Sequence, residues 1–164
     1  MGHNICAIIG KNSVSKDKIM EFGLAAAFEK EFAIIILDFD IVWELKSKYD
    51  LSVDSTSDYI EWDCELSHFI AKEIGMEKYG IIQTDYFGGI GEQCASLYIE
   101  GIISISEKSI NTILTELGVK CEGGLDEFDS INLGEYRQSE YYYWKDHNWA
   151  DRKENMIAGK LSNQ

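Results

Sequence analysis

Cysteine and histidine are residue types that can bind metals or take part in nucleophilic catalysis, and this chain has four cysteines and three histidines. Cys64 and His68 are four residues apart, so on a helix their side chains face the same way and could share a metal ion. No further ligand follows at zinc spacing, and we expect His68 to be a helix-surface or satisfied core histidine. Cys121 and His147 are a second conceivable pair, but nothing in their spacing orients one toward the other. We therefore expect neither a metal site nor a catalytic Cys–His pair.

Glycines cluster in the segment Asp85–Glu92, whose composition invites comparison with a phosphate-binding loop. Such loops bind because backbone N–H groups and a helix N-terminus face the anion. Here the glycines lead into a predicted strand, lysine is absent, and a carboxylate stands at each end of the segment. We interpret the segment as a hairpin loop whose glycines supply positive φ angles.

Two aspartates, Asp38 and Asp40, directly follow the apolar run Ala33–Leu37. The arrangement resembles the first motif of haloacid-dehalogenase-type phosphohydrolases. The resemblance implies that one aspartate attacks phosphorus, that the other acts as general acid, and that Mg²⁺ joins them. Against it, Ile41 stands where that family has glycine, and the family has a parallel sheet. In the alternative, two carboxylates simply end a strand of an acidic protein. The remaining catalytic roles would fall to residues farther along the chain: Thr84, Lys108 or Lys120, Asp126 and Asp129.

Aromatic residues gather near the C-terminal end of the chain, at 141–144 and at Trp149. Consecutive side chains cannot all face one core in a helix or a strand, so some should be exposed. Exposed tyrosine and tryptophan are enriched at binding hot spots. In the alternative, alternate rings cover a sheet edge and the others are half-buried. We predict a partner-binding site with aromatic anchors and a nearby acidic rim: Tyr142, Trp144 and Trp149, with Asp126, Glu127 and Asp129.

The overall charge is strongly negative, with 29 Asp and Glu against 15 Lys and Arg and a formal net charge of −14. Such a surface repels nucleic acid, whose phosphates are already negative, and speeds encounter with basic proteins. We therefore expect a basic protein partner, no nucleic-acid partner and no cofactor.

The elements that must position these residues follow from the periodicity of apolar residues. The run 33–37 predicts a central strand that is covered on both faces, and 4–10 predicts another buried strand. Short links around 88–91 and 100–101 force antiparallel pairing of the strands they join. We predict an α+β fold: a single sheet with an antiparallel meander over about 79–105, packed by helices over about 15–30, 58–74 and 106–117.

Length and composition predict one domain over 1–150, followed by a tail at 151–164 that we expect to be frayed. The 45% hydrophobic content is ordinary for a globular protein and excludes disorder over most of the chain. The cysteines are widely spaced, and the sequence has no signal-peptide pattern and no long apolar run. We expect a cytoplasmic protein with reduced thiols and no membrane partner.

Two segments, Thr84–Tyr98 and Asp126–Arg137, resemble parts of small bacterial proteins of polymorphic toxin systems, including immunity proteins of contact-dependent growth inhibition. The resemblance implies a protein that binds and blocks a cognate toxin domain. Nuclease toxins are basic because they must hold phosphates. The resemblance, the acidity and the missing catalytic constellation together favour an inhibitor over an enzyme. The alternative is a Mg²⁺-dependent phosphohydrolase that uses Asp38 and Asp40.

Overall fold

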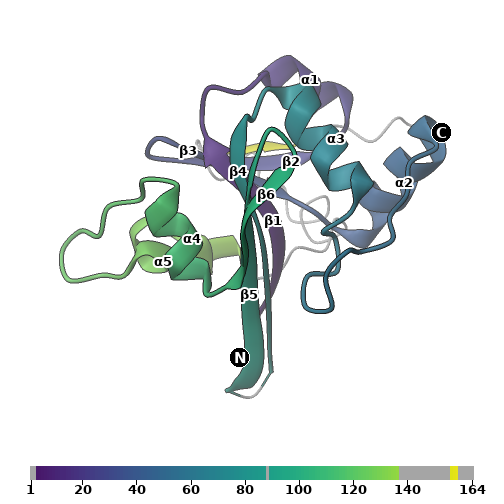
Figure 1. Cartoon of the computed structure of the whole chain (residues 1–164). Helices are drawn as coiled ribbons and strands as arrows, with labels where there is room; N and C mark the ends of the chain where they lie inside the picture. Colours follow the sequence, from purple (N-terminus) through teal and green to yellow (C-terminus); the bar gives the residue numbers. More distant parts are fainter. Residues whose placement is uncertain (1–2, 88, 137–155, 159–164) are drawn as a thin grey trace.

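Figure 1 shows the computed structural model, which describes residues 3–87, 89–136 and 156–158. In this part of the chain seven strands form one sheet in the order β6-β5-β4-β1-β3-β2-β7, and each neighbouring pair is antiparallel. The predicted α+β class and the antiparallel meander are confirmed. The strands are β1 (His3–Lys11), β2 (Ala25–Glu29), β3 (Phe32–Ile36), β4 (Lys78–Phe87), β5 (Ile90–Ile99), β6 (Ile102–Lys108) and β7 (Met156–Ala158).

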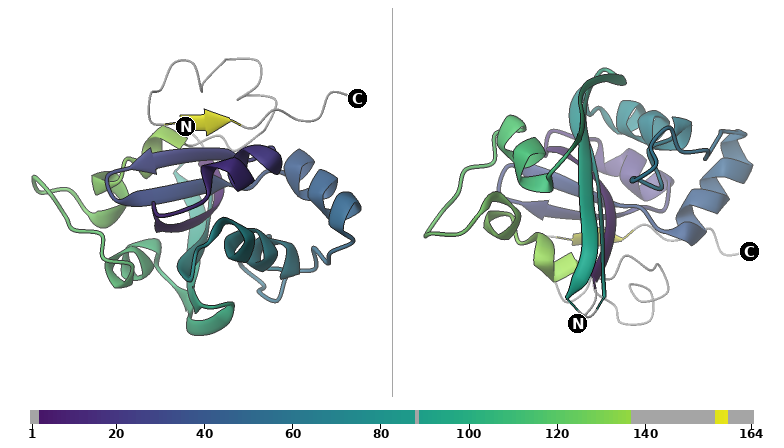
Figure 2. Two further views of the ribbon diagram at one scale, coloured as in Figure 1. Left: turned by 90° about the horizontal axis from the view of Figure 1, so that it is seen from above. Right: turned by 60° about the horizontal axis from the view of Figure 1, so that its bottom comes forward.

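Helices cover both faces of the sheet, so the fold has three layers with a separate core on each face (Figures 1 and 2). One core lies under α1 (Lys16–Glu21), α2 (Phe39–Tyr49) and α3 (Glu65–Ile74). The other lies under α4 (Ile110–Glu116), α5 (Glu127–Ser130) and the 3-10 helix η1 (Leu133–Tyr136). Strand β3 feeds both cores because side chains alternate along a strand: Ile35 faces the first core and Ile34 the second.

The helix predicted over 15–30 is only partly correct, because α1 ends at Glu21 and Ala25–Glu29 forms strand β2. Ser15 caps α1, and Gly23 takes a φ of +71° where the chain turns. Side chains alternate along β2, so Ala26 lies in the first core and Ala27 in the second. Pairing with β3 overrides the helical preference of alanine.

The other two predicted helices begin later than expected. Residues 58–64 form a loop, held by side chains such as Ser57, whose hydroxyl oxygen accepts from the Tyr59 N–H, and α3 starts only at Glu65. Likewise α4 starts after its cap, Ser109, because residues 106–108 continue strand β6. At 58–64, hydrogen bonds made by serine hydroxyls compete with helix formation. At 106–108, pairing with the neighbouring strand β5 competes with it.

The β4–β5 hairpin is the longest ribbon of the sheet and extends to the bottom of Figure 1. Its residues pair continuously from Lys78 opposite Ile99 to Phe87 opposite Ile90. Strand β1 accompanies β4 almost to this tip, pairing as far as Tyr86. Strand β6 accompanies β5 only to Ala95, opposite Lys108. The distal half of β5 therefore has no strand on its outer side within the described residues.

At the opposite edge of the sheet, Met156–Ala158 pairs with Ala25–Ala27, so three residues of the segment expected to fray are paired; the rest of 151–164 lies outside the described residues. The four cysteines are free thiols, and Cys6 is buried in the core. Among the described residues, no helix has the length and apolar character needed to cross a bilayer.

Candidate functional site

The distal half of the β4–β5 hairpin carries six side chains on one face, arranged as three cross-strand pairs. Alternation along each strand puts these residues on the side of the sheet that also holds Ile81 and Tyr98 of the first core. The pair nearest the core is half-buried, whereas the side chains toward the tip are exposed. The three pairs are Gln83 with Cys94, Asp85 with Glu92, and Phe87 with Ile90.

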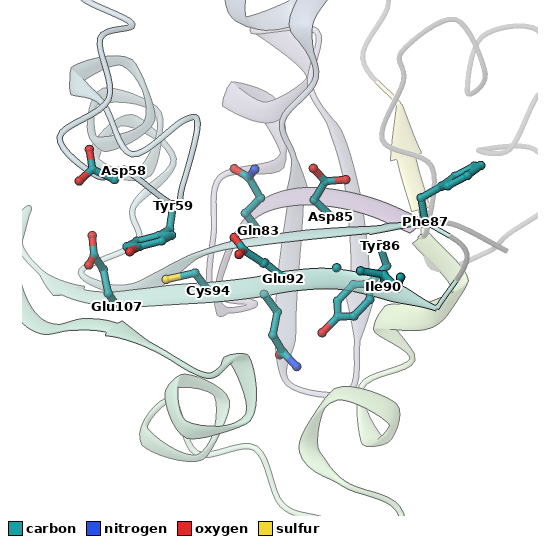
Figure 3. Close-up of a pocket in the computed structure, with 12 residues that line it drawn as sticks. Asp58, Tyr59, Gln83, Asp85, Tyr86, Phe87, Ile90, Glu92, Cys94 and Glu107 are labelled. Carbon is teal, nitrogen blue, oxygen red and sulfur yellow. The ribbon is translucent and has the colours of Figure 1, made fainter.

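This face forms one wall of an open groove of about 790 Å³. The loop residues Asp58 and Tyr59 and the β6 residue Glu107 close its inner end, and Phe87 stands at its outer end (Figure 3). Three separate segments of the chain therefore meet at this groove. We call it the hairpin groove.

Two hydrogen bonds attach the loop to the sheet at the inner end of the groove. The Glu61 N–H donates to Oε1 of Gln83 at 2.5 Å, and the Ser57 hydroxyl donates to Oε1 of Glu107 at 2.8 Å. The hairpin itself depends on Gly91, because a Cβ there would lie 2.1 Å from the carbonyl oxygen of Asp85. Backbone pairing and contacts to the loop thus set the shape of the groove.

Carboxylates dominate the electrostatics of the hairpin groove: Asp58, Asp85, Glu92 and Glu107 line it, and no lysine, arginine or histidine is among the described residues that line it. Asp85 and Glu92 lie directly opposite each other across the two strands. Like charges in that arrangement destabilise a sheet by a few tenths of a kcal/mol up to about 1 kcal/mol. Among the described residues, neither makes an ion pair. Burial, and then the carboxylate of Glu107, raises the pKa of the Cys94 thiol.

The tip of the groove is apolar and strongly exposed. Phe87 is 85% exposed, its cross-strand neighbour Ile90 is 83% exposed, and Tyr59 at the inner end is 56% exposed. A paired phenylalanine and isoleucine on a hairpin tip gain little for folding, because water still covers them. Exposed apolar groups beside a polar rim are typical of protein interaction sites.

A second polar cluster lies at the base of the same hairpin, but it is buried and internally satisfied. Oδ2 of Asp63 accepts from the Tyr98 hydroxyl at 2.5 Å, and Oδ1 lies 3.2 Å from Nε2 of His68. Nδ1 of His68 lies 2.7 Å from the Tyr79 hydroxyl. Both nitrogens of His68 are therefore occupied by protein groups, in agreement with the expectation of a satisfied histidine. Cys64 is also buried and contacts Ser67.

The acidic residues predicted near the C-terminal end have local roles in the structure. Asp126 caps α5 through the Asp129 N–H and accepts from the side chain of Asn111, while Glu127 accepts from the Thr115 hydroxyl. Hydrogen bonds from its own backbone N–H, then from Thr115 and Cys121, lower the pKa of Glu127. Asp129 is exposed. The predicted anchors, Tyr142, Trp144 and Trp149, lie outside the described residues.

The geometry around Asp38 gives no support to phosphoryl transfer. Its carboxylate caps α2, with Oδ1 accepting from the Ile41 N–H at 2.9 Å, and Asp40 is exposed on the first turn of that helix. Thr84 is buried and accepts from the Ile5 N–H. The strand before Asp38 is antiparallel to both of its neighbours, unlike the sheet of the phosphohydrolases that the motif resembles.

The sequence contains a signal for the hairpin groove in the residues on either side of its turn. In the sequence, Asp85 and Glu92 are interpreted only as flanks that argue against phosphate binding, and Phe87 and Ile90 are not identified as site residues. With a two-residue connection at 88–89, each pair is symmetric about the turn and must face across the strands. The contributions of Asp58, Tyr59 and Glu107 are set by tertiary packing and have no counterpart in local spacing.

In comparisons with known proteins, no family model, no curated protein and no solved structure matches the chain.

Proposed function

We propose that this chain is a small acidic inhibitor, an immunity protein that binds a basic toxin domain of the nuclease type and blocks it in the cytoplasm. The observation that carries the proposal is the hairpin groove, where Asp85 faces Glu92 beside the exposed pair Phe87 and Ile90. The resemblance of Thr84–Tyr98 to immunity proteins falls on this same hairpin.

The charges of the groove favour a cationic partner for two reasons. First, lysine or arginine side chains of a partner would relieve the repulsion between Asp85 and Glu92. Binding would therefore recover the free energy that this repulsion costs the unbound protein. Second, the net charge of −14 attracts basic proteins over long range and raises their association rate. Carboxylates in a groove can also occupy the positions that phosphates take on a nuclease.

The apolar tip supplies the part of the affinity that carboxylates cannot. Charged groups must lose water on binding, and this cost offsets much of their attraction. An acidic surface alone therefore speeds association and orients the partner more than it raises the affinity. Phe87, Ile90 and Tyr59 provide apolar area beside the acids, which is the usual arrangement of a hot spot and its rim.

The experiment that tests the proposal is affinity capture from a native lysate at low salt, followed by a toxicity assay. The baits are the wild type, the groove variant D85N/E92Q, and the matched control E77Q/E116Q. The control removes the same charge at exposed glutamates that do not line the groove. We expect a basic protein that the wild type and the control retain and that the groove variant loses.

The captured protein, expressed alone, should arrest growth, and co-expression of the wild-type chain should restore it. A partner retained equally by the groove variant and the control would contradict the proposed site. A captured protein without toxicity would contradict the inhibitor function.

A further inference from the structure

The outer side of β5 changes character halfway along the strand. From Ala95 to Ile99 it pairs with β6. At Lys108 the chain leaves the sheet, and Ser109 begins α4. Within the part of the chain that the structure describes, residues Ile90–Cys94 of β5 therefore have a strand on one side only, and these five residues also line the hairpin groove. The open edge and the acidic groove are thus the same place.

The direction of the backbone groups along this edge follows from the two turns of the meander. Ile90 faces Phe87 across a two-residue connection, so its N–H and C=O point toward β4. Because these directions alternate along a strand, Gly91 and Gln93 point their N–H and C=O outward. The turn at the other end of β5 gives the same result. Ile99 faces Ile102 across the Glu100–Gly101 turn, so its N–H and C=O point toward β6, on the outer side of β5. Gly91 and Gln93 lie an even number of residues from Ile99, so their N–H and C=O point to the same side.

We propose that the toxin domain inserts an extended segment with lysine or arginine side chains into the hairpin groove, where it pairs with the open edge of β5 at Gly91 and Gln93. This inference rests on the proposed function and specifies the element that the partner supplies. The segment would continue the line of β6 beyond Lys108, at the place that the chain vacates on entering α4. Strand addition to an open edge is a general mode of peptide recognition, with backbone hydrogen bonds for affinity and side chains for specificity.

Charge decides what kind of segment fits. An inserted strand alternates its side chains between two faces, and those on the groove face would meet Asp85, Glu92 and Glu107. Cationic side chains satisfy these carboxylates, whereas a second copy of this chain would bring its own acidic surface, at −14 per molecule, against them. A basic partner segment is therefore favoured over self-association.

The test uses two synthetic probes with the full chain. One is a capped peptide of alternating lysine and threonine, and the other is the same peptide with methyl groups on two adjacent central amide nitrogens. Methylation of adjacent nitrogens blocks one donor on each edge of the peptide and keeps its charge. If strand pairing occurs, the methylated peptide should bind about tenfold more weakly or worse, as expected for the loss of a backbone hydrogen bond. Equal binding of the two peptides, or no binding of either, would overturn the proposal.

A pair of variants tests the same edge from the side of this chain. Gln93→Pro removes the outward N–H at a site where proline is tolerated, because the N–H faces away from the neighbouring strand. Gln93→Ala, the matched comparison, changes the side chain and keeps the N–H. We expect Q93P to bind the unmethylated peptide about tenfold more weakly than Q93A does. Equal affinities of the two variants would overturn strand pairing.

The groove variant D85N/E92Q separates this inference from the proposed function. If the two peptides bind the wild type equally and both weaken on D85N/E92Q, the acidic groove stands and strand pairing is wrong. If neither peptide binds, strand pairing is wrong, and the capture experiment still decides whether a basic toxin binds the groove.

Discussion

The two halves of the β4–β5 hairpin use the same strand pair in opposite ways. In the half near the core, Ile81, Ile82, Ala95 and Leu97 are buried, and the polar groups of Tyr79 and Tyr98 are paired with His68 and Asp63. In the half near the tip, Asp85 faces Glu92 and the apolar pair at 87 and 90 is exposed to water. The ladder continues through both halves without a break in register.

The side chains of the distal half therefore contribute little to the stability of the isolated chain, in contrast to those near the core. A sheet is normally stabilised by complementary cross-strand pairs. In the distal half a like-charged pair destabilises the sheet, and the exposed apolar pair beside it adds little stability. Natural proteins commonly give up some stability at sites that serve function.

A matched pair of truncations should separate the two halves most clearly. Ile81→Ala removes a fully buried side chain and should lower the free energy of unfolding by about 3 kcal/mol, because a cavity remains in the core. Phe87→Ala at the tip should change it by less than about 0.5 kcal/mol, since the ring is already exposed. Urea unfolding followed by circular dichroism measures both. Similar losses for the two variants would contradict the division of the hairpin.

The buried half should also give the fold an alkaline limit. Burial, and then the charge of Asp63, raises the pKa of Tyr79 from 10.0 to about 12. The folded state therefore holds this proton more tightly than the unfolded state does. The resulting stability is fully present below pH 10 and is lost as pH rises toward 12.

Urea unfolding of the wild type and of Tyr79→Phe across this pH interval checks the prediction. The variant loses the hydroxyl that contacts His68 and should be less stable at neutral pH, but its stability should fall less steeply above pH 10. Parallel curves for the two proteins would show that Tyr79 does not set the limit.

The smallest effect has an unusual sign. Glu92→Gln removes one of two opposed carboxylates and should raise the free energy of unfolding by about 0.5 kcal/mol, with a smaller gain at high salt. The same change should weaken binding of the partner. Glu116→Gln, at an exposed glutamate of α4, is the control and should leave binding unchanged. A loss of stability in E92Q would mean that the pair is not repulsive.

The sequence predicted the parts of the fold that depend on local pattern. Alternation and the Glu100–Gly101 turn identified the meander, and both turn residues take positive φ angles, as tight hairpin turns require. The same reasoning failed at Ala25–Glu29, because alanines fit a helical face as readily as a strand buried on both sides. Which interpretation holds depends on pairing with β3, a contact that no local pattern contains.

The candidate site was predicted less completely than the fold. The expectation of an acidic binding surface with aromatic anchors placed the contact near 126–149, where charged and aromatic residues are adjacent in sequence. The hairpin groove combines the same types of side chain from 58–59, 83–94 and 107, which only the folded chain brings together. Asp126 and Glu127, by contrast, are engaged in and around α5.

The proposal that the partner binds the hairpin groove can be tested by hydrogen exchange of the chain, with and without the partner obtained by capture. This measurement locates the contact along the sequence. The account predicts that slowing concentrates in residues 83–94, with the outward amides of Gly91 and Gln93 among the most affected. Protection that leaves this hairpin unchanged and appears instead around 126–136, or in the aromatic segment after it, would contradict the hairpin groove as the binding site.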